Sequence, residues 1–217
     1  MPLLIFDLDG TLIDSSRDLV ISTNAMLRHL GRPEVDEKTV NSYVGDGAPK
    51  LVRRALGDEA NDAEFDAAYA FFIRYYRAHS LENTNLYPGI REALDELRGP
   101  ENVLAVLTNK PVKISCDILA GLKLANYFFR VYGGDSFPSK KPDPVGIETL
   151  LREANVPRES AVMIGDSSVD ISTAKNAGVR ALGVSWGLKP DSLNDPPADL
   201  IIHESRQLVE SLRVVRQ

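Results

Sequence analysis

Beyond residue 87 the chain alternates short apolar runs with amphipathic helical patterns, and this alternation constrains the fold more than any other feature. Apolar runs bounded by turn residues predict buried strands at 103–107, 129–132, 161–164, 180–184 and 200–202. Helical patterns lie beside them at 90–98, 112–122, 144–154, 169–177 and 205–214. Strands that alternate with helices of this length form right-handed βαβ units around a parallel sheet. We therefore predict an α/β fold with a doubly wound, Rossmann-like parallel sheet.

An earlier strand, 3–6, is separated from the others by a long stretch that contains only helical patterns. Ser15 and Ser16 are suitable N-caps for the first of these helices. Further helical patterns follow at 36–43, 48–56 and 64–80. The simplest organisation is an α-helical cap domain, residues 15–85, inserted after the first strand into a core made of residues 1–14 and 86–217.

The composition favours a globular protein with small partners. Of the 217 residues 43% are hydrophobic, enough for a sizeable core, and the formal net charge of −6 disfavours binding to nucleic acids or anionic membranes. The apolar runs are too short to span a bilayer. The only cysteine, Cys116, excludes an intramolecular disulfide, and we expect it to be buried in a helix. We expect a cytoplasmic protein, monomeric or homodimeric.

Polar side chains follow each predicted strand, at the sheet edge where ligands bind in folds of this kind. The acidic ones are Asp7, Asp9, Asp166 and Asp170. Alone, Asp166 would be ordinary turn chemistry. Four carboxylates at one edge repel each other unless a cation neutralises them, and a hard divalent cation takes oxygen ligands. This edge is therefore a candidate Mg²⁺ site, although Mn²⁺ would satisfy the same ligands.

The first strand carries a candidate nucleophile. Asp7 ends the strand, and a carboxylate there can form an aspartyl-phosphate. Asp9 can protonate the leaving oxygen and later deprotonate water if the turn directs it into the same pocket. Gly10 allows that turn, and the Thr11 hydroxyl can brace it. These residue types point to phosphoryl transfer.

Basic and hydroxyl groups at neighbouring strand ends complete the candidate site. Thr108 and Lys141, together with backbone N–H groups, can bind the oxygens of a transferring phosphoryl group and stabilise its charge. Asn109 lies beside Thr108 as a supporting residue. The sequence thus places phosphate-binding groups opposite an acidic cluster.

Four segments resemble, in order, the four motifs of the haloacid dehalogenase-like phosphatase superfamily. They are 7–14 (DLDGTLID), 107–111 (LTNKP), 141–144 (KPDP) and 165–170 (GDSSVD). The resemblance implies that Asp7 is the nucleophile, that Asp9 is the acid/base and binds the metal through its backbone carbonyl, and that Asp166 is the third metal ligand. It also implies that Asp170 orients the metal-bound water or the lysine. The lysine preceding proline, Lys141, is the implied phosphate ligand, with Lys140 a solvated neighbour.

The insertion lies between the first and second motifs, which resembles the subgroup with helical C1 caps. Segment 43–56 is similar to the cap segment of bacterial phosphoglycolate phosphatases. Gly45 and Gly47 let the backbone approach a ligand, and the helix that follows offers free N–H groups to a carboxylate. Lys50 adds positive charge near the start of that helix, whereas Arg53 and Arg54 fit a solvated face. We therefore expect hydrolysis of a small phosphorylated metabolite, 2-phosphoglycolate first.

Other functions fit parts of this pattern. A haloacid dehalogenase shares the fold but needs neither Asp9 nor an acidic fourth motif. Phosphatases of sugar phosphates or pyrophosphate, and phosphoglucomutase-like phosphotransferases, share the core and differ in the cap. A non-catalytic phosphoacceptor also places an aspartate beside Mg²⁺, but it gains nothing from an acid at Asp9. A dinucleotide-binding enzyme is excluded because no G-x-G-x-x-G follows the first strand.

Overall fold

The protein contains the predicted parallel α/β sheet. The structure is a computed structural model that describes residues 1–214; residues 215–217, which the predicted core includes, lie outside the described part. Six strands pair in parallel in the order β5-β4-β1-β6-β7-β8, so β1 lies inside the sheet. They are β1 (Leu3–Phe6), β4 (Val103–Leu107), β5 (Arg130–Tyr132), β6 (Ala161–Gly165), β7 (Arg180–Val184) and β8 (Leu200–Ile202). The predicted fold class is confirmed.

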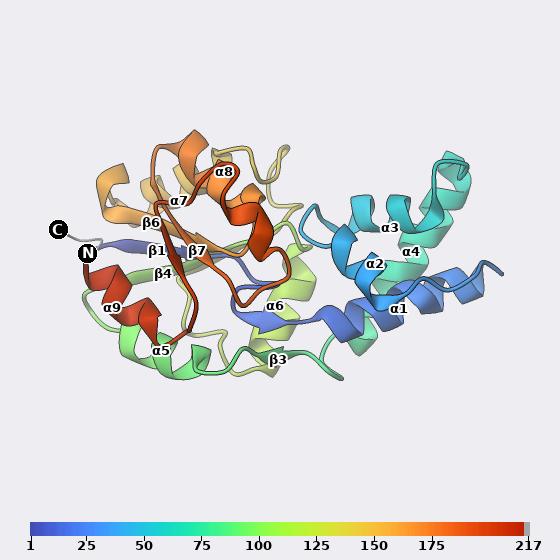
Figure 1. Cartoon of the computed structure of the whole chain (residues 1–217), viewed down its shortest axis with the longest axis horizontal. Helices are drawn as coiled ribbons and strands as arrows, with labels where there is room; N and C mark the ends of the chain where they lie inside the picture. The colour runs from blue at the N-terminus through green and yellow to red at the C-terminus, as the bar shows by residue number, and fades with distance from the viewer. Residues whose placement is uncertain (215–217) are drawn as a thin grey trace.

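Helices cover both faces of the sheet, which makes the fold doubly wound (Figure 1). Leu4 and Phe6 of β1 belong to a core cluster with residues of α5 (Ile90–Leu97), α6 (Val112–Gly121) and α9 (Gln207–Val214). Leu3 and Ile5 point to the other face and belong to a cluster with α7 (Val145–Ala154) and α8 (Ser168–Ala177). Because both faces of β1 are buried, the strand is uniformly apolar rather than alternating. Single 3-10 turns lie at Arg158–Ser160 and Pro190–Leu193.

Four helices form a separate group beyond one end of the sheet (Figure 1). They are α1 (Ser16–His29), α2 (Glu37–Tyr43), α3 (Ala48–Leu56) and α4 (Asp62–His79). The chain enters this group through β2 (Ile13–Asp14) and leaves it through β3 (Asn85–Leu86), and these two short strands pair antiparallel. We propose that residues 15–85 are a cap unit and that this ribbon is its hinge. No helix within the described residues is long and apolar enough to cross a membrane.

Three local features differ from expectation. The β2–β3 ribbon was not predicted, because two residues per strand are too short to show a pattern. Helix α4 begins at Asp62 rather than Glu64, because Asn61 and Glu64 form a capping box that starts the helix earlier. Cys116 is exposed on α6, so its expected burial was wrong. The apolar face of α6 is formed by other residues, Ile114, Ile118 and Leu119 among them.

Candidate active site

The carboxyl end of β1 places Asp7 in the interior of the protein. The Asp7 amide donates to the Ile164 carbonyl of the neighbouring β6, which continues the ladder by one residue and fixes the aspartate at the sheet edge. Only 7% of Asp7 is exposed. Its Oδ1 lies 2.9 Å from the Nζ of Lys141, which arrives from the loop after β5. The predicted nucleophile and the predicted phosphate ligand are therefore in contact.

Strand β6 places two more carboxylates beside Asp7. Asp166 follows the strand, and its Oδ2 accepts hydrogen bonds from the backbone N–H groups of Leu188 (2.7 Å) and Lys189 (3.3 Å). Asp170 lies in the first turn of α8, where its Oδ2 accepts from the amide and hydroxyl of Ser167. Its Oδ1 accepts from Lys141 at 2.5 Å. Asp170 therefore caps its helix and also orients Lys141.

The burial of these charges has electrostatic consequences. Burial raises the pKa of Asp7 to about 6, although the Lys141 ammonium opposes the shift. Burial, with the charges of Asp170 and Asp7, also raises the pKa of Asp166 well above its usual value. Burial alone would lower the pKa of Lys141, but the two carboxylates beside it outweigh burial and raise that pKa. The cluster is thus short of positive charge.

The donor set suits a divalent cation. One oxygen from each of Asp7, Asp166 and Asp170 lies within 4.8 Å of the others, and all three residues are buried. Three carboxylates with one lysine carry a net charge of about −2, which a divalent cation would neutralise. Hard oxygen ligands of this kind match Mg²⁺. Both oxygens of Asp170 already have protein partners, so Asp7 and Asp166 are the better candidates for direct ligands.

The turn after β1 brings its backbone against Asp166. Gly10 has a φ of +81°, and a Cβ placed on it would lie 2.2 Å from the Oδ2 of Asp166. Gly187, which belongs to none of the four motif segments, approaches the same residue: a Cβ there would lie 2.3 Å from the Cβ of Asp166. Both positions are therefore restricted to glycine by the Asp166 side chain.

Gly10→Ala should lower kcat/KM by about 10²-fold, because the added Cβ would displace Asp166 and a displacement of about 1 Å in an active site costs that much. The variant should also lose about 1–3 kcal/mol of stability from its left-handed backbone. Gly31→Ala is the matched control: Gly31 also has a positive φ (+67°), but a Cβ added there would meet no described atom within 4 Å. Steady-state kinetics and thermal melts of both variants check this. Equal kcat/KM in the two variants would contradict it.

Asp9 is held by groups from both sides of the site. Its Oδ1 accepts a hydrogen bond from the Ser15 hydroxyl at 2.6 Å. The Nζ of Lys110 lies 2.8 and 2.9 Å from the two Asp9 oxygens and donates to the Tyr76 hydroxyl at 2.5 Å. Ser15 was expected to cap α1, but its hydroxyl accepts no cap hydrogen bond there, because the oxygen is oriented toward Asp9, to which the hydroxyl donates. Lys110 lies in the loop after β4, within the motif segment 107–111, and the sequence pattern predicts no individual role for it.

The remaining predicted residues lie around the same edge of the sheet. Thr108 ends β4, is buried, and its hydroxyl accepts from the Lys110 amide at 3.3 Å. The Asn109 amide group donates to the carbonyls of Gly45 (3.0 Å) and Lys141 (3.1 Å), which joins the loop after β4 to the cap. Thr11 is buried, and its hydroxyl has no hydrogen-bond partner among the described residues.

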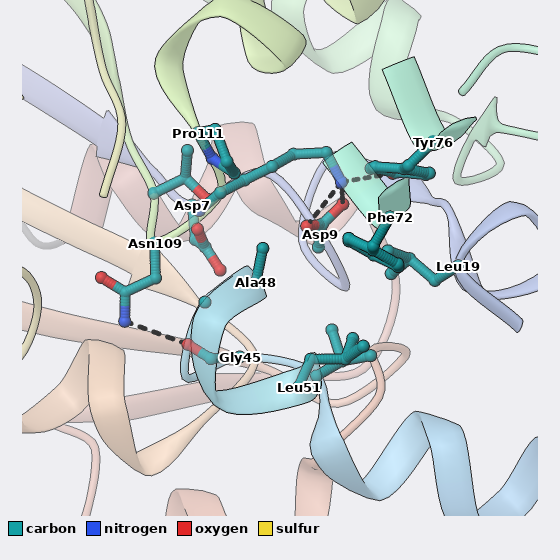
Figure 2. A pocket seen from close by; sticks show the side chains of 14 residues that line it. Asp7, Asp9, Leu19, Gly45, Ala48, Leu51, Phe72, Tyr76, Asn109 and Pro111 are labelled. Carbon is teal, nitrogen blue, oxygen red and sulfur yellow. Dashed lines mark hydrogen bonds and ion pairs between the residues drawn. The ribbon is translucent and has the colours of Figure 1, made fainter. Parts of the chain in front are cut away.

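The cap closes a small cavity over Asp7 and Asp9. Figure 2 shows both carboxylates facing Ala48 and Leu51 of α3, with Phe72 and Tyr76 of α4 at one side. The enclosed free space is about 40 Å³. A cavity of this size between an acidic cluster and an apolar cap suits a small ligand.

The three predicted cap residues differ in position. Gly45 and Gly47 line the cavity. The Lys50 ammonium instead lies 3.8 Å from the carboxylate of Asp46 and is largely exposed. Lys140, expected to be solvated, donates from its Nζ to the Asp46 carbonyl at 2.5 Å. It thereby forms another contact between core and cap.

Comparisons with known proteins agree with the geometry. The model of the haloacid dehalogenase-like hydrolases matches residues 4–184. A phosphoglycolate phosphatase of Pseudomonas syringae pv. tomato is 39% identical over 95% of this chain and 78% of that protein. One of Chromobacterium violaceum is 35% identical over 96% and 95%. The crystal structure of a predicted phosphoglycolate phosphatase from Haemophilus somnus 129PT superposes with a TM-score of 0.92 at 30% identity, over 97% of both chains.

Proposed function

The chain belongs to the haloacid dehalogenase-like hydrolase family. From this premise we propose that it is a Mg²⁺-dependent phosphatase that reacts through an aspartyl-phosphate on Asp7. The observation that carries the proposal is the contact of Asp7 with Lys141 inside a buried acidic cluster, from which Asp7 also lines the cap cavity. Buried, mutually repelling carboxylates beside a lysine are arranged for reaction rather than for stability.

In the proposed reaction a carboxylate oxygen of Asp7 attacks the phosphorus atom. The new O–P bond forms while the bond to the substrate's alkoxide oxygen breaks, and Asp9 gives its proton to that leaving oxygen. Water then attacks the phosphorus atom of the aspartyl-phosphate while Asp9 takes a proton from that water. The bond between phosphorus and the Asp7 oxygen breaks, which releases phosphate and restores the Asp7 carboxylate. Lys141 and Thr108 bind the phosphoryl oxygens during both steps.

The metal would be held by Asp7 and Asp166, with the Asp9 carbonyl as the ligand that the family resemblance implies. When bound, Mg²⁺ supplies positive charge that lets an anionic phosphate approach an anionic carboxylate. Asp170 acts through Lys141, since it orients the lysine and takes no part in bond making. Lys141 thereby neutralises part of the charge of the cluster and remains directed at Asp7.

We propose 2-phosphoglycolate as the preferred substrate. The relatives named above are phosphoglycolate phosphatases, and segment 43–56 lines the cavity with Gly45 and Gly47 at the start of α3. Free N–H groups at that helix end suit a substrate carboxylate. The exposed thiol of Cys116 suits a reducing compartment, and we place the activity in the cytoplasm.

The test compares phosphate release from 2-phosphoglycolate, glucose 6-phosphate, pyrophosphate and p-nitrophenyl phosphate, each with Mg²⁺ and with EDTA. We expect kcat/KM for 2-phosphoglycolate to be the highest by about 10²-fold or more, because a site that binds a polar substrate group rejects analogues without it. EDTA should abolish all activity. A preference for the hexose phosphate would reject 2-phosphoglycolate as the preferred substrate and would leave the proposed phosphatase mechanism standing. Only one phosphate bound per chain, without turnover, would instead indicate a phosphoacceptor.

A further inference from the structure

Two buried lysines pair with three of the four carboxylates of the site. Lys141 contacts Asp7 and Asp170, whereas Lys110 contacts Asp9 through both carboxylate oxygens. The Lys110 side chain is only 3% exposed. A buried ammonium costs several kcal/mol unless it is paired. The fold therefore holds this second lysine at a cost that its contacts with Asp9 must offset.

The partners of Lys110 come from different parts of the protein. Asp9 belongs to the loop after β1, Lys110 to the loop after β4, and Tyr76 to helix α4 of the cap. Figure 2 shows Asp9 and Tyr76 on either side of one nitrogen, joined to it by dashed lines. That nitrogen is the Lys110 Nζ, which also lies 4.5 Å from the centre of the Tyr76 ring. A hydroxyl contact and a cation–π contact thus join the cap to the lysine.

We propose that Lys110 is a positioning residue that orients the Asp9 carboxylate toward the leaving oxygen. Through its contact with Lys110, Tyr76 makes this orientation depend on the position of the cap. The inference rests on the proposed acid/base role of Asp9. Proton transfer requires a heavy-atom distance of about 2.6–3.2 Å to the leaving oxygen, so a carboxylate free to rotate transfers less efficiently. Lys110 binds both oxygens and removes that freedom.

The hydroxyl of Ser15 strengthens the link to the cap. Ser15 precedes α1, the first cap helix, and donates to Asp9 Oδ1. Ser15 and Tyr76 therefore reach this acidic group from the cap or its linker, while Lys110 reaches it from the core. Displacement of the cap would withdraw Ser15 and Tyr76 and leave Lys110 as the core contact of Asp9, so all three groups would hold Asp9 in place only while the cap covers the substrate. This arrangement couples proton transfer to closure.

A test with two leaving groups distinguishes aiming from packing or substrate binding. Protonation by Asp9 matters for the alkoxide of 2-phosphoglycolate and matters little for p-nitrophenolate, which leaves without help. Lys110→Met should lower kcat/KM for 2-phosphoglycolate by about 10²-fold and for p-nitrophenyl phosphate by less than about tenfold. Tyr76→Phe, which keeps the ring, should shift the ratio in the same direction by a smaller factor. Lys113→Met, an exposed lysine on α6, is the control and should change neither value.

A double-variant comparison completes the test. In an Asp9→Asn background, Lys110→Met should cause no further loss, because the residue it aims is already gone. Equal losses on both substrates, or a full additional loss in the Asp9→Asn background, would overturn the inference. A rise in KM for 2-phosphoglycolate with unchanged kcat would also overturn it and would make Lys110 a substrate ligand. If Lys110→Met does not fold, Tyr76→Phe and Lys110→Arg carry the same comparison. An inactive wild type on both substrates would reject the proposed function itself.

Discussion

Purified Asp7→Asn protein should have no measurable turnover, with kcat at least on the order of 10⁴-fold below the wild type, because the side-chain amide of asparagine cannot form the aspartyl-phosphate intermediate. The side chain keeps its shape, so the fold should persist, and the lost charge relieves repulsion from Asp166 and Asp170 in a buried cluster. Phosphate release and a thermal melt measure the two effects. The melting temperature in EDTA should equal or exceed that of the wild type.

Two comparisons sharpen this expectation. Asp9→Asn should lower the rate by only about 10²–10⁴-fold, because it removes proton transfer and leaves the nucleophile. Asp58→Asn, at an exposed aspartate between α3 and α4, should keep full activity. Acid-quenched wild-type enzyme should carry one phosphate on a peptide that contains Asp7. If Asp7→Asn keeps more than about 1% of the wild-type turnover, Asp7 is not the nucleophile.

The parallel sheet was predictable because its signals are local. Each strand is an apolar run, each helix has its own periodicity, and the carboxyl ends of parallel strands meet at one edge. Asp7, Lys141 and Asp166 therefore fall together in the structure as the sequence pattern predicts. The helices between the first two strands of the large sheet were predictable for the same reason, since each has its own apolar spacing.

The contacts that were not predictable join residues far apart in the chain. Lys110 and Asp9 are 101 residues apart, and a lysine beside an asparagine and a proline carries no local sign of an aspartate partner. Gly187 approaches Asp166 only because the loop after β7 folds over the end of β6. Ser15 has the composition of a helix cap, and only the position of Asp9 diverts its hydroxyl. Tertiary contacts decide how such a side chain is oriented, and helix-cap propensity does not.

The second prediction with a large effect concerns the stability of the hinge. Asp18, in the first turn of α1, is 1% exposed and accepts five hydrogen bonds from the chain that leaves the cap. The donors are the backbone N–H groups of Asn83 and Thr84 and the side chains of both residues. Asp18→Ala would leave buried donors without an acceptor. We expect a loss of about 4 kcal/mol in the free energy of unfolding and a fall in melting temperature on the order of 10 °C.

We call the contacts of Asp18 with Asn83 and Thr84 the clamp. Two further variants distinguish the stability that the clamp contributes from the small contributions of exposed side chains. Glu82→Ala removes an exposed carboxylate beside Asn83 that pairs with His79, and should cost less than about 0.5 kcal/mol. Asp18→Asn keeps the shape and one acceptor oxygen, so its loss should be intermediate. Urea unfolding of the three variants measures the ranking. A loss in Asp18→Ala no greater than that in Glu82→Ala would mean that the β2–β3 pairing alone holds the two linkers together.

If the clamp is as strong as these contacts imply, the cap cannot separate its two linkers and must move as one body on the β2–β3 ribbon. Asp18→Ala should then affect kinetics in a particular way. A looser cap covers the substrate less often, so KM should rise at temperatures where the variant is folded, while the chemistry at Asp7 is unaltered. Asp18 itself does not line the cavity, whereas the adjacent Leu19 does, so a rise in KM would reach the cavity through α1 and the hinge. An unchanged KM in fully folded Asp18→Ala would confine the clamp to stability.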